Sequence, residues 1–277
     1  IVPIRLSEKE YVRAHDFRRY LHKNLEDFII ETPLENPLDF LNKQFDASLI
    51  KDVQTKWLPY DFRNQNIDDF LENLNIDKTV EISSIQGGYS NAIKQLNKFI
   101  AVGYQDYAKY RSDPSKEASS QLSPYFHSGQ ISTHEVFDKI SELESWSPES
   151  INPKMVGRRE GWWGSSENFE SFMDELITWR ELGYHTCVRR ANYNQYSSLP
   201  EWAIKTLQEH SSDEREHIYS LDELTYSQTH DEIWNAAQNQ LRTQGVIQNY
   251  LRMLWGKKIL EWTPNPQIAL SYMITLN

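Results

Sequence analysis

At 277 residues the chain can bury a sizeable core, either as one large domain or as two small ones. Its only cysteine, Cys187, excludes an intrachain disulfide and fits a reducing cytosol or nucleoid, and no apolar run approaches the ~20 residues needed to span a membrane. The formal net charge of −11 excludes a uniformly basic nucleic-acid-binding surface but not a local one, because Arg189–Arg190 and Lys257–Lys258 are adjacent basic pairs.

Helical periodicity runs through almost the whole sequence, and alternating strand patterns are hard to find. Phe17, Leu21 and Leu25 form one apolar stripe at helical spacing. The predicted helices cover residues 8–30, 39–45, 68–74, 90–110, 132–143, 166–185, 202–210, 229–244, 246–262 and 267–276. The sequence therefore predicts an all-α chain without βαβ units.

The segment SSQLSPYF begins with serines that cluster just before a predicted helix. Ser119, Ser120 and Ser123 bring hydroxyls to a place where backbone N–H groups and the helix dipole favour a phosphate. On this motif alone, an N-cap followed by a turn is the favoured interpretation, and phosphate binding is the alternative.

The segment DELITWREL, residues 174–182, places Glu175 and Trp179 four residues apart, on one helix face, with Arg180 beside them. Such a set is usually surface packing in which long side chains lie along apolar surface. A carboxylate, an indole ring and a guanidinium can also form a binding face.

Residues 229–262 hold three tryptophans, Trp234, Trp255 and Trp262, among polar residues that a helix packing for stability alone would not need. Seven residues separate the last two, which places them on one face about 10 Å apart along a helix. The rings are either a packed seam, the favoured interpretation from spacing alone, or stepping stones for an electron.

The remaining chemistry-bearing residues predict no further site. His127, His185 and His210 lack the spacing of metal ligands, so no metal site is expected. Cys187 has no His/Asp constellation around it, and we expect a buried, inert thiol. Trp162–Trp163 is interpreted as a packing element in a Gly-rich loop over residues 157–166.

Residues 119–132, 174–182 and 229–262, in this order, resemble the photolyase/cryptochrome family, most closely its class II-like cyclobutane-dimer photolyases. The resemblance implies the family's helical FAD-binding domain as a single domain over residues 1–277. Residues 1–118 would form its N-terminal helical part and connector, and residues 119–277 the part that faces flavin and DNA. The family's N-terminal α/β antenna domain is absent from this chain, and we expect the helical domain to be incomplete at its C-terminus.

The resemblance also implies roles for individual residues. Those expected to bind FAD are Tyr110, Ser119, Ser120, Gln121, Leu122, Ser123, Arg180, Asn249 and Arg252. Those expected to face the lesion are Glu175, Trp179, Gln238 and Met253. Glu175 is also expected to act in catalysis, and electrons would pass along Trp255, Trp234 and Trp262, with Trp255 nearest the flavin and Trp262 at the exit. In one branch of the family the Glu-to-Trp spacing is one residue shorter than that between Glu175 and Trp179.

The implied function is light-driven repair of cyclobutane pyrimidine dimers in DNA by electron transfer from reduced FAD, the chemistry of a carbon–carbon lyase. We expect a monomer that binds damaged DNA in the cytoplasm, at the bacterial nucleoid, and no membrane; an antenna chromophore requires the N-terminal domain. Two alternatives stay open: a cryptochrome-like flavin photoreceptor without repair activity, and a helical interaction module without flavin.

Overall fold

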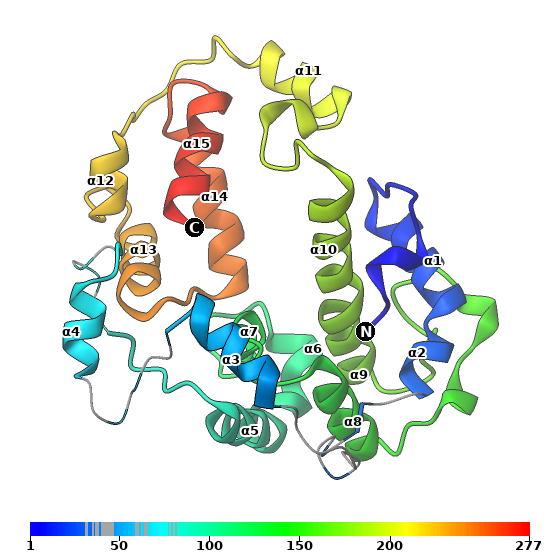
Figure 1. Cartoon of the computed structure of the whole chain (residues 1–277). Coiled ribbons are helices and arrows are strands. Elements are labelled where there is room, and N and C mark those ends of the chain that lie inside the picture. Colours follow the sequence, from blue (N-terminus) through cyan, green and yellow to red (C-terminus); the bar gives the residue numbers. More distant parts are fainter. Residues whose placement is uncertain are drawn as a thin grey trace. The chain divides into compact units, whose positions relative to one another are not determined.

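The computed structural model describes residues 1–30, 33, 34, 36, 39, 47–58, 61, 63, 66–76, 78, 80 and 82–277. The chain divides into two compact units, a larger one formed by Ile1–Thr32 and Ser83–Asn277 and a smaller one formed by Pro33–Ile82. The predicted all-α fold is confirmed for the described residues, which contain helices and turns but no strand (Figure 1). In these residues no helix is both long and apolar enough to cross a bilayer.

The smaller unit contains two of the described helices. They are α3 (Ala47–Lys56) and α4 (Ile67–Glu72), and α4 corresponds to the helix predicted over residues 68–74. The side chain of Asn66 caps α4 by accepting a hydrogen bond from the N–H of Asp68, 3.0 Å away. The helix predicted over residues 39–45 lies outside the described residues, apart from Asp39.

The larger unit contains the remaining described helices, and seven of its thirteen α-helices begin within three residues of a predicted start. Its α-helices are α1 (Ala14–Asn24), α2 (Glu26–Ile30), α5 (Tyr89–Lys98), α6 (Tyr107–Tyr110), α7 (Ser123–His127), α8 (Thr133–Leu143), α9 (Glu167–Met173), α10 (Arg180–Arg189), α11 (Glu201–Glu209), α12 (Leu221–Thr225), α13 (Glu232–Gln244), α14 (Asn249–Glu261) and α15 (Pro266–Leu276). The side chains of Ser132, Ser166 and Asp231 cap α8, α9 and α13 at their N-termini.

Two π-helical turns interrupt the long helices that periodicity predicted as regular. They are η3 (Phe99–Gly103), which follows α5, and η7 (Asp174–Trp179), which joins α9 to α10. A π-turn takes up one extra residue in a helix and leaves the flanking turns in place. The second π-turn, η7, contains two of the predicted site residues, Glu175 and Trp179.

The first predicted helix was wrong at its start. It was expected from residue 8, but α1 begins at Ala14, and Arg13 has extended backbone angles. The reason is tertiary: the ring Nε2 of His185 lies 2.6 Å from the carbonyl oxygen of Lys9 and donates a hydrogen bond to it. That carbonyl is thereby engaged by a side chain from α10 and not by a helical N–H.

Two hydrophobic clusters hold the larger unit together. The first packs α1, α5, α8 and α9 around buried residues such as Phe17, Leu21 and Phe169. A bidentate ion pair, Arg18 to Asp174 with N–O distances of 2.8 and 2.9 Å, joins α1 to η7 within it. The second cluster lies among α12, α13, α14 and α15, which are neighbours in Figure 1. It comprises Leu224, Trp234, Trp255, Ile259, Trp262 and Ala269.

Candidate functional site

The serine segment, residues 119–123, is an anchored turn between α6 and α7. Leu122 is fully buried and fixes it to the core, and Gln121 adopts a left-handed backbone conformation with φ of 54°. The amide of Gln95 donates a hydrogen bond of 2.9 Å to the carbonyl of Ser120. The side chains of Gln121 and Ser123 are exposed, so the segment presents polar groups on a fixed backbone.

Cationic side chains accompany this segment. The guanidinium of Arg180, at the start of α10, lies 5.7 Å from the ring centroid of Phe126, three residues after Ser123. Gln121 also lines an open groove of about 360 Å³ together with Lys94 and Lys98. Hydroxyls, backbone N–H groups and nearby cations are the groups that bind phosphate, so these residues fit the diphosphate of a dinucleotide.

Glu175 lies at the junction of three elements. Its Oε1 is 2.6 Å from Nη1 of Arg111, which directly follows α6, and the backbone carbonyl of Arg111 accepts a 2.8 Å hydrogen bond from Nε2 of Gln248. Gln248 in turn caps α14, since its Oε1 accepts the N–H groups of Tyr250 and Leu251. Sequence reasoning missed Arg111 and Gln248, because a link over 64 or 137 residues leaves no local pattern.

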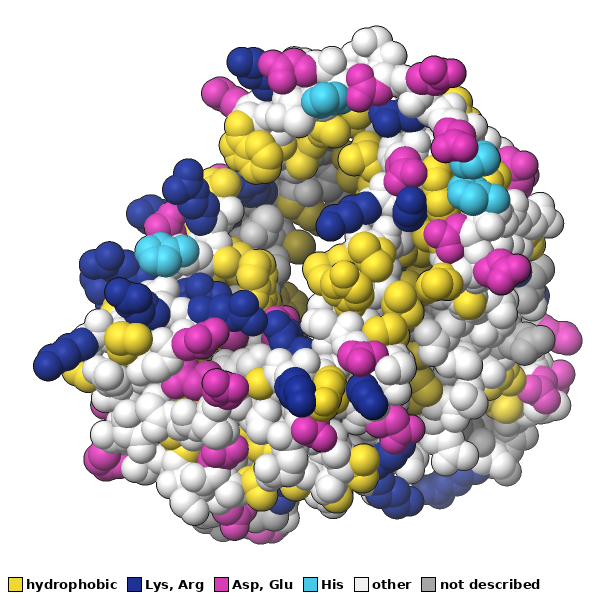
Figure 2. Space-filling model, turned by 180° about the vertical axis from the view of Figure 1, so that it is seen from behind, with side chains coloured by type: hydrophobic (Ala, Val, Ile, Leu, Met, Phe, Trp, Pro, Cys, Tyr) yellow, Lys and Arg dark blue, Asp and Glu magenta, His cyan; other side chains and the backbone are white. Residues whose placement is uncertain are grey.

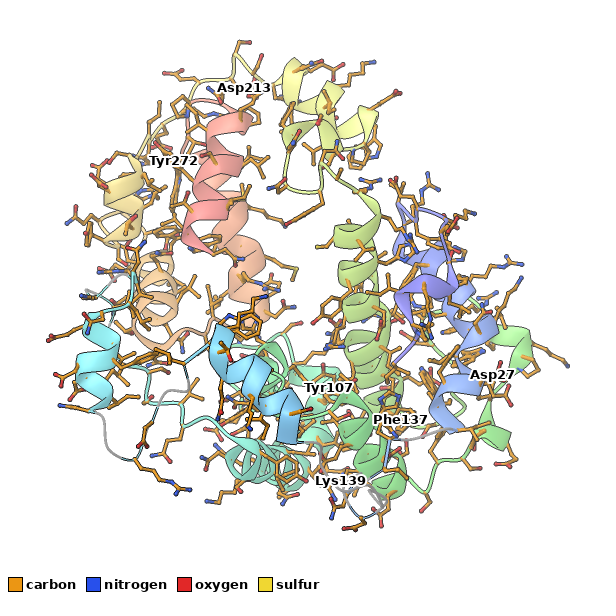
Figure 3. The ribbon with its side chains drawn as sticks, viewed as in Figure 1. Asp27, Tyr107, Phe137, Lys139, Asp213 and Tyr272 are labelled. Carbon is orange, nitrogen blue, oxygen red and sulfur yellow. The ribbon has the colours of Figure 1, made fainter. Side chains whose placement is uncertain are left out.

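Arg111 is held from a second side by an aromatic ring. Its guanidinium carbon lies 5.9 Å from the ring centroid of Tyr107, on α6. Tyr107 is labelled in Figure 3. Tyr110, one turn later on the same helix, is half-buried, and its ring is approached by Nζ of Lys109 at 4.6 Å and Nζ of Lys116 at 5.6 Å. The end of α6 therefore carries two tyrosines with different neighbours: Tyr107 contacts the guanidinium that pairs with Glu175, and Tyr110 contacts two lysines.

The π-turn η7 carries Glu175 near its start and Trp179 at its end. Trp179 is 48% exposed, so an apolar aromatic surface is open to solvent at this position. A π-turn holds one residue more than an α-helical turn, and this turn spans Glu175 and Trp179. In one branch of the family, the resemblance implies a Glu-to-Trp spacing that is one residue shorter. π-turns of this kind are frequent at functional sites.

The first turns of α14 present polar and flexible side chains to solvent. Asn249, Arg252 and Met253 are all exposed, and Nη2 of Arg252 donates a 3.0 Å hydrogen bond to Oδ1 of Asn249. Figure 2 shows that the face seen from behind is hollowed, with hydrophobic side chains in its walls and Lys and Arg side chains around them. This hollow lies between α10 and the α14–α15 pair, whose positions are seen in Figure 1.

The three tryptophans of residues 229–262 form a continuous series of rings, here called the tryptophan chain. Trp255 and Trp234 are parallel, with centroids 6.3 Å apart and an interplanar angle of 1°, and Trp234 meets Trp262 edge-on at 5.6 Å. All three are buried, and Trp234 lies in contact with both of the others. Trp255 lies on α14 shortly after Arg252 and Met253, and it is buried whereas those two residues are exposed.

Hydrogen bonds fix the orientation of two of these indoles. Nε1 of Trp234 donates to the backbone carbonyl of Trp255 at 3.2 Å, and Nε1 of Trp255 donates to Oε1 of Gln238 at 2.7 Å. Gln238, predicted to line the lesion pocket, is almost completely buried and spends its carbonyl oxygen on Trp255. The structure thus places Gln238 in contact with the tryptophan chain.

The remaining chemistry-bearing residues lie outside the sites described above. Cys187 was predicted to be buried, but it is exposed. The last turns of α10 bury one face, which includes His185, and Cys187 lies on the other face. The described part of the chain holds no group of three or more His, Cys, Asp or Glu side chains arranged for a metal ion. Trp162 and Trp163 pack inside the first hydrophobic cluster.

Comparison with known proteins adds evidence from sequence. No family model matches the chain. The chain is 32% identical to deoxyribodipyrimidine photo-lyases from Potorous tridactylus over 274 residues and from Methanothermobacter thermautotrophicus over 278 residues. These matches cover 98% and 100% of the chain but 45% and 54% of the relatives, so the chain spans about half the length of the curated relatives it matches. Cryptochrome-2 of Arabidopsis thaliana is 48% identical over 50 residues.

Proposed function

The chain belongs to the photolyase/cryptochrome family, and on that premise we propose that it works in light-driven repair of cyclobutane pyrimidine dimers in DNA, with FAD as cofactor. The observation that carries the proposal is the position of the tryptophan chain. Its inner ring, Trp255, lies on α14 behind Asn249, Arg252 and Met253, the exposed residues predicted to meet flavin and lesion. A route for electrons that starts at such a surface is what a photoreducible flavoprotein needs.

The residues of this chain fit the two ends of FAD. Ser119, Ser120 and Ser123, the backbone of Gln121 and Leu122, and Arg180 would hold the diphosphate. Tyr110, Asn249 and Arg252 would lie toward the ring system. When bound, FAD supplies light-driven one-electron chemistry that no amino-acid side chain provides.

The protein's own contribution is to hold the damaged bases and to exclude water from them. A dimer is poorly stacked and costs less to take out of the duplex than an intact base step. Trp179 and Met253 offer exposed apolar surface on which its rings can pack. The carboxyl of Glu175, held in place by Arg111, would hydrogen-bond to the dimer's polar edge.

The localisation and assembly expected from the sequence are part of this proposal. We infer a monomer that acts on DNA in the bacterial nucleoid. Its net charge of −11 calls for a restricted basic contact surface. Among the described residues, Lys154, Arg158 and Arg159 are exposed and form no ion pair, so they are available for phosphates.

The test is a repair assay on the flavin-loaded protein. We expect illuminated protein to remove cyclobutane dimers from an oligonucleotide and to leave them intact in the dark. Glu175→Gln should lower the repair yield while flavin binding persists. Binding of flavin with light-dependent reduction but no repair would support instead the cryptochrome-like photoreceptor. No binding of flavin would support a helical interaction module.

A further inference from the structure

Two adjacent carboxylates at the start of η7 are bound by different parts of the fold. Asp174 pairs with Arg18 on α1, and Glu175 pairs with Arg111, which follows α6. Successive residues of a helix project in different directions around its axis. Two guanidinium groups therefore hold the π-turn from two directions.

The two ion pairs differ in burial and in geometry. The side chains of Arg18 and Asp174 are 9% and 5% exposed, whereas those of Arg111 and Glu175 are 19% and 32% exposed. Nε and Nη2 of Arg18 bind the two oxygens of Asp174 in parallel, a planar arrangement that leaves the carboxylate little freedom to rotate. Glu175 binds Arg111 through Oε1 alone, and its Oε2 accepts no hydrogen bond from the described part of the chain. The buried carboxylate is thus fixed, and the exposed one still has an oxygen to offer to a ligand.

The helix that carries Arg18 is itself held in place. Phe17 and Leu21, which flank Arg18 on α1, are buried in the first hydrophobic cluster. One turn after Arg18, Nδ1 of His22 accepts the N–H of Gly157 at 3.0 Å. Because its own backbone is anchored on both sides, Arg18 can serve as a fixed point for η7.

A second bond ties the helix beyond the π-turn to the segment that leads into α1. His185, on α10, donates to the carbonyl oxygen of Lys9. Asp174 is the first residue of η7 and His185 lies after its last, so the two ties enclose the turn. A π-turn contains one residue more than an α-helical turn. Between two fixed ends this extra residue has to be accommodated inside the turn, where Glu175 lies.

Stability alone does not account for a buried ion pair at this place. Burial removes both charges from water, and apolar side chains of similar volume often stabilise a fold equally well or better. Apolar contacts, however, have no preferred direction, whereas a bidentate pair between a guanidinium and a carboxylate does. Because Asp174 directly precedes Glu175, the direction of the first side chain sets that of the second.

We propose that Arg18 and Asp174 are positioning residues for Glu175. By holding the first residue of the π-turn against α1, they keep Glu175 where Arg111 binds Oε1 and where Oε2 is presented to the substrate. Neither residue of the buried pair touches flavin or DNA in this role, since both act through Glu175. The role rests on the proposed function, which assigns Glu175 to the polar edge of the dimer.

The test is a double-mutant cycle on repair by the flavin-loaded protein. Arg18→Met together with Asp174→Leu removes both charges and fills their space with apolar groups. At saturating dimer-containing oligonucleotide, we expect this double replacement to lower the repair yield per absorbed photon by the same factor as Glu175→Gln. In the Glu175→Gln background it should cause no further loss, because both changes act through one carboxylate. A general loss of packing would lower the yield in both backgrounds.

Two further variants keep the result decisive. Arg18→Lys keeps a positive charge beside Asp174 but loses the two parallel hydrogen bonds, so it should also lower the yield. It takes the place of the double replacement in the cycle if circular dichroism shows that the latter does not fold. Tyr104→Phe is the matched control, because it removes a buried hydrogen bond to Glu144 from the same cluster and none to η7. Its repair yield should equal that of the unmodified protein.

Hydrogen exchange of the whole chain without DNA measures the hold on the π-turn directly. We expect the protection of the η7 amides to fall in the double replacement and to persist in Tyr104→Phe; unchanged protection in both would overturn the proposal. A full repair yield in the double replacement, or an equal loss in both backgrounds, would overturn it and leave the proposed function standing. An unmodified protein that binds flavin but repairs no dimer would refute the two together.

Discussion

The larger unit contains two groups of three contacting tryptophans, and they differ in what surrounds them. The core group is Trp146, Trp162 and Trp163, with ring centroids 5.4 Å apart for Trp146 and Trp163 and 4.8 Å apart for Trp162 and Trp163. These separations are no longer than those of the tryptophan chain formed by Trp255, Trp234 and Trp262. Distance between rings therefore does not distinguish a packed core from an electron route.

The histidine beside each group does distinguish them. In the core group, His22 stacks on Trp162 at 3.9 Å and is buried, and its Nδ1 already accepts the N–H of Gly157. Burial, followed by the nearby Arg18, lowers the pKa of His22 to about 3, so this imidazole takes no proton near neutral pH. Beside the tryptophan chain, His230 is exposed and its Nδ1 faces a phenol. The histidine of the core group is therefore enclosed by packed side chains, whereas the histidine beside the tryptophan chain lies at the surface.

The largest expected effect comes from changing one tryptophan in each group. Trp255 and Trp163 are both 4% exposed. Trp255→Phe should abolish light-driven reduction of the bound flavin while repair by chemically reduced protein persists, because only the route inward is interrupted. Trp163→Phe should leave light-driven reduction intact. Transient absorption measures both, and equal loss in the two variants would show that ring position does not matter.

The next effect is on folding and belongs to the core group. Trp162→Ala removes a side chain that is 1% exposed and should lower the free energy of unfolding by about 3–5 kcal/mol. Trp202→Ala, at a position 73% exposed on α11, should change it by no more than about 0.5 kcal/mol. Urea denaturation followed by circular dichroism gives both values. Similar costs for the two variants would contradict the packing described here.

A smaller effect concerns the buried acceptor of the tryptophan chain. Gln238→Met keeps the volume of the side chain but leaves the indole N–H of Trp255 without its partner, which should cost about 1–3 kcal/mol of unfolding free energy. Asn239→Met, on the exposed side of the same helix, should be close to neutral. If both variants unfold at the same urea concentration as the unmodified protein, Gln238 does not hold Trp255 in solution.

A separate effect is a pH dependence of stability, which is expected from the buried histidine of the core group. The pKa of His22 is lowered in the folded state, so the unfolded chain binds the proton more readily between about pH 6.5 and pH 3. Stability should therefore fall as pH decreases through this window, by up to about 1.4 kcal/mol per pH unit. His22→Asn should flatten the curve, whereas His15→Asn, at an exposed histidine, should not. Identical slopes for all three proteins would refute the burial argument.

Much of the fold could be predicted from local patterns. The stripe around Phe17, Leu21 and Leu25 and the caps at Ser132 and Ser166 are local signals, and α1, α8 and α9 follow from them. The start of α1 and the π-turn η7 could not be predicted, because a distant histidine and the packing of a whole helix decide them. The exposure of Cys187 was missed for the same reason: periodicity does not say how far a helix extends past its core.

The residues of the candidate site could likewise be predicted from the sequence only in part. The tryptophans and the serine segment could be identified because each lies within a short segment of sequence. The bond from Arg111 to Glu175 and the cap by Gln248 join residues that are far apart in the chain and carry no motif. Arg18 and Asp174, 156 residues apart, have no spacing that would suggest a pair. Their relation exists only after α1 has packed against η7.

The π-turn at Asp174–Trp179 also bears on how the length of such chains can vary. Because it holds one residue more than an α-helical turn, deletion of a single residue there would restore a regular helix. The cap at Ser166 and the hydrogen bond from His185 to Lys9 would keep their partners, and only side chains inside the turn would change direction. Insertions and deletions of one residue can therefore accumulate at this position during evolution without any compensating gap elsewhere.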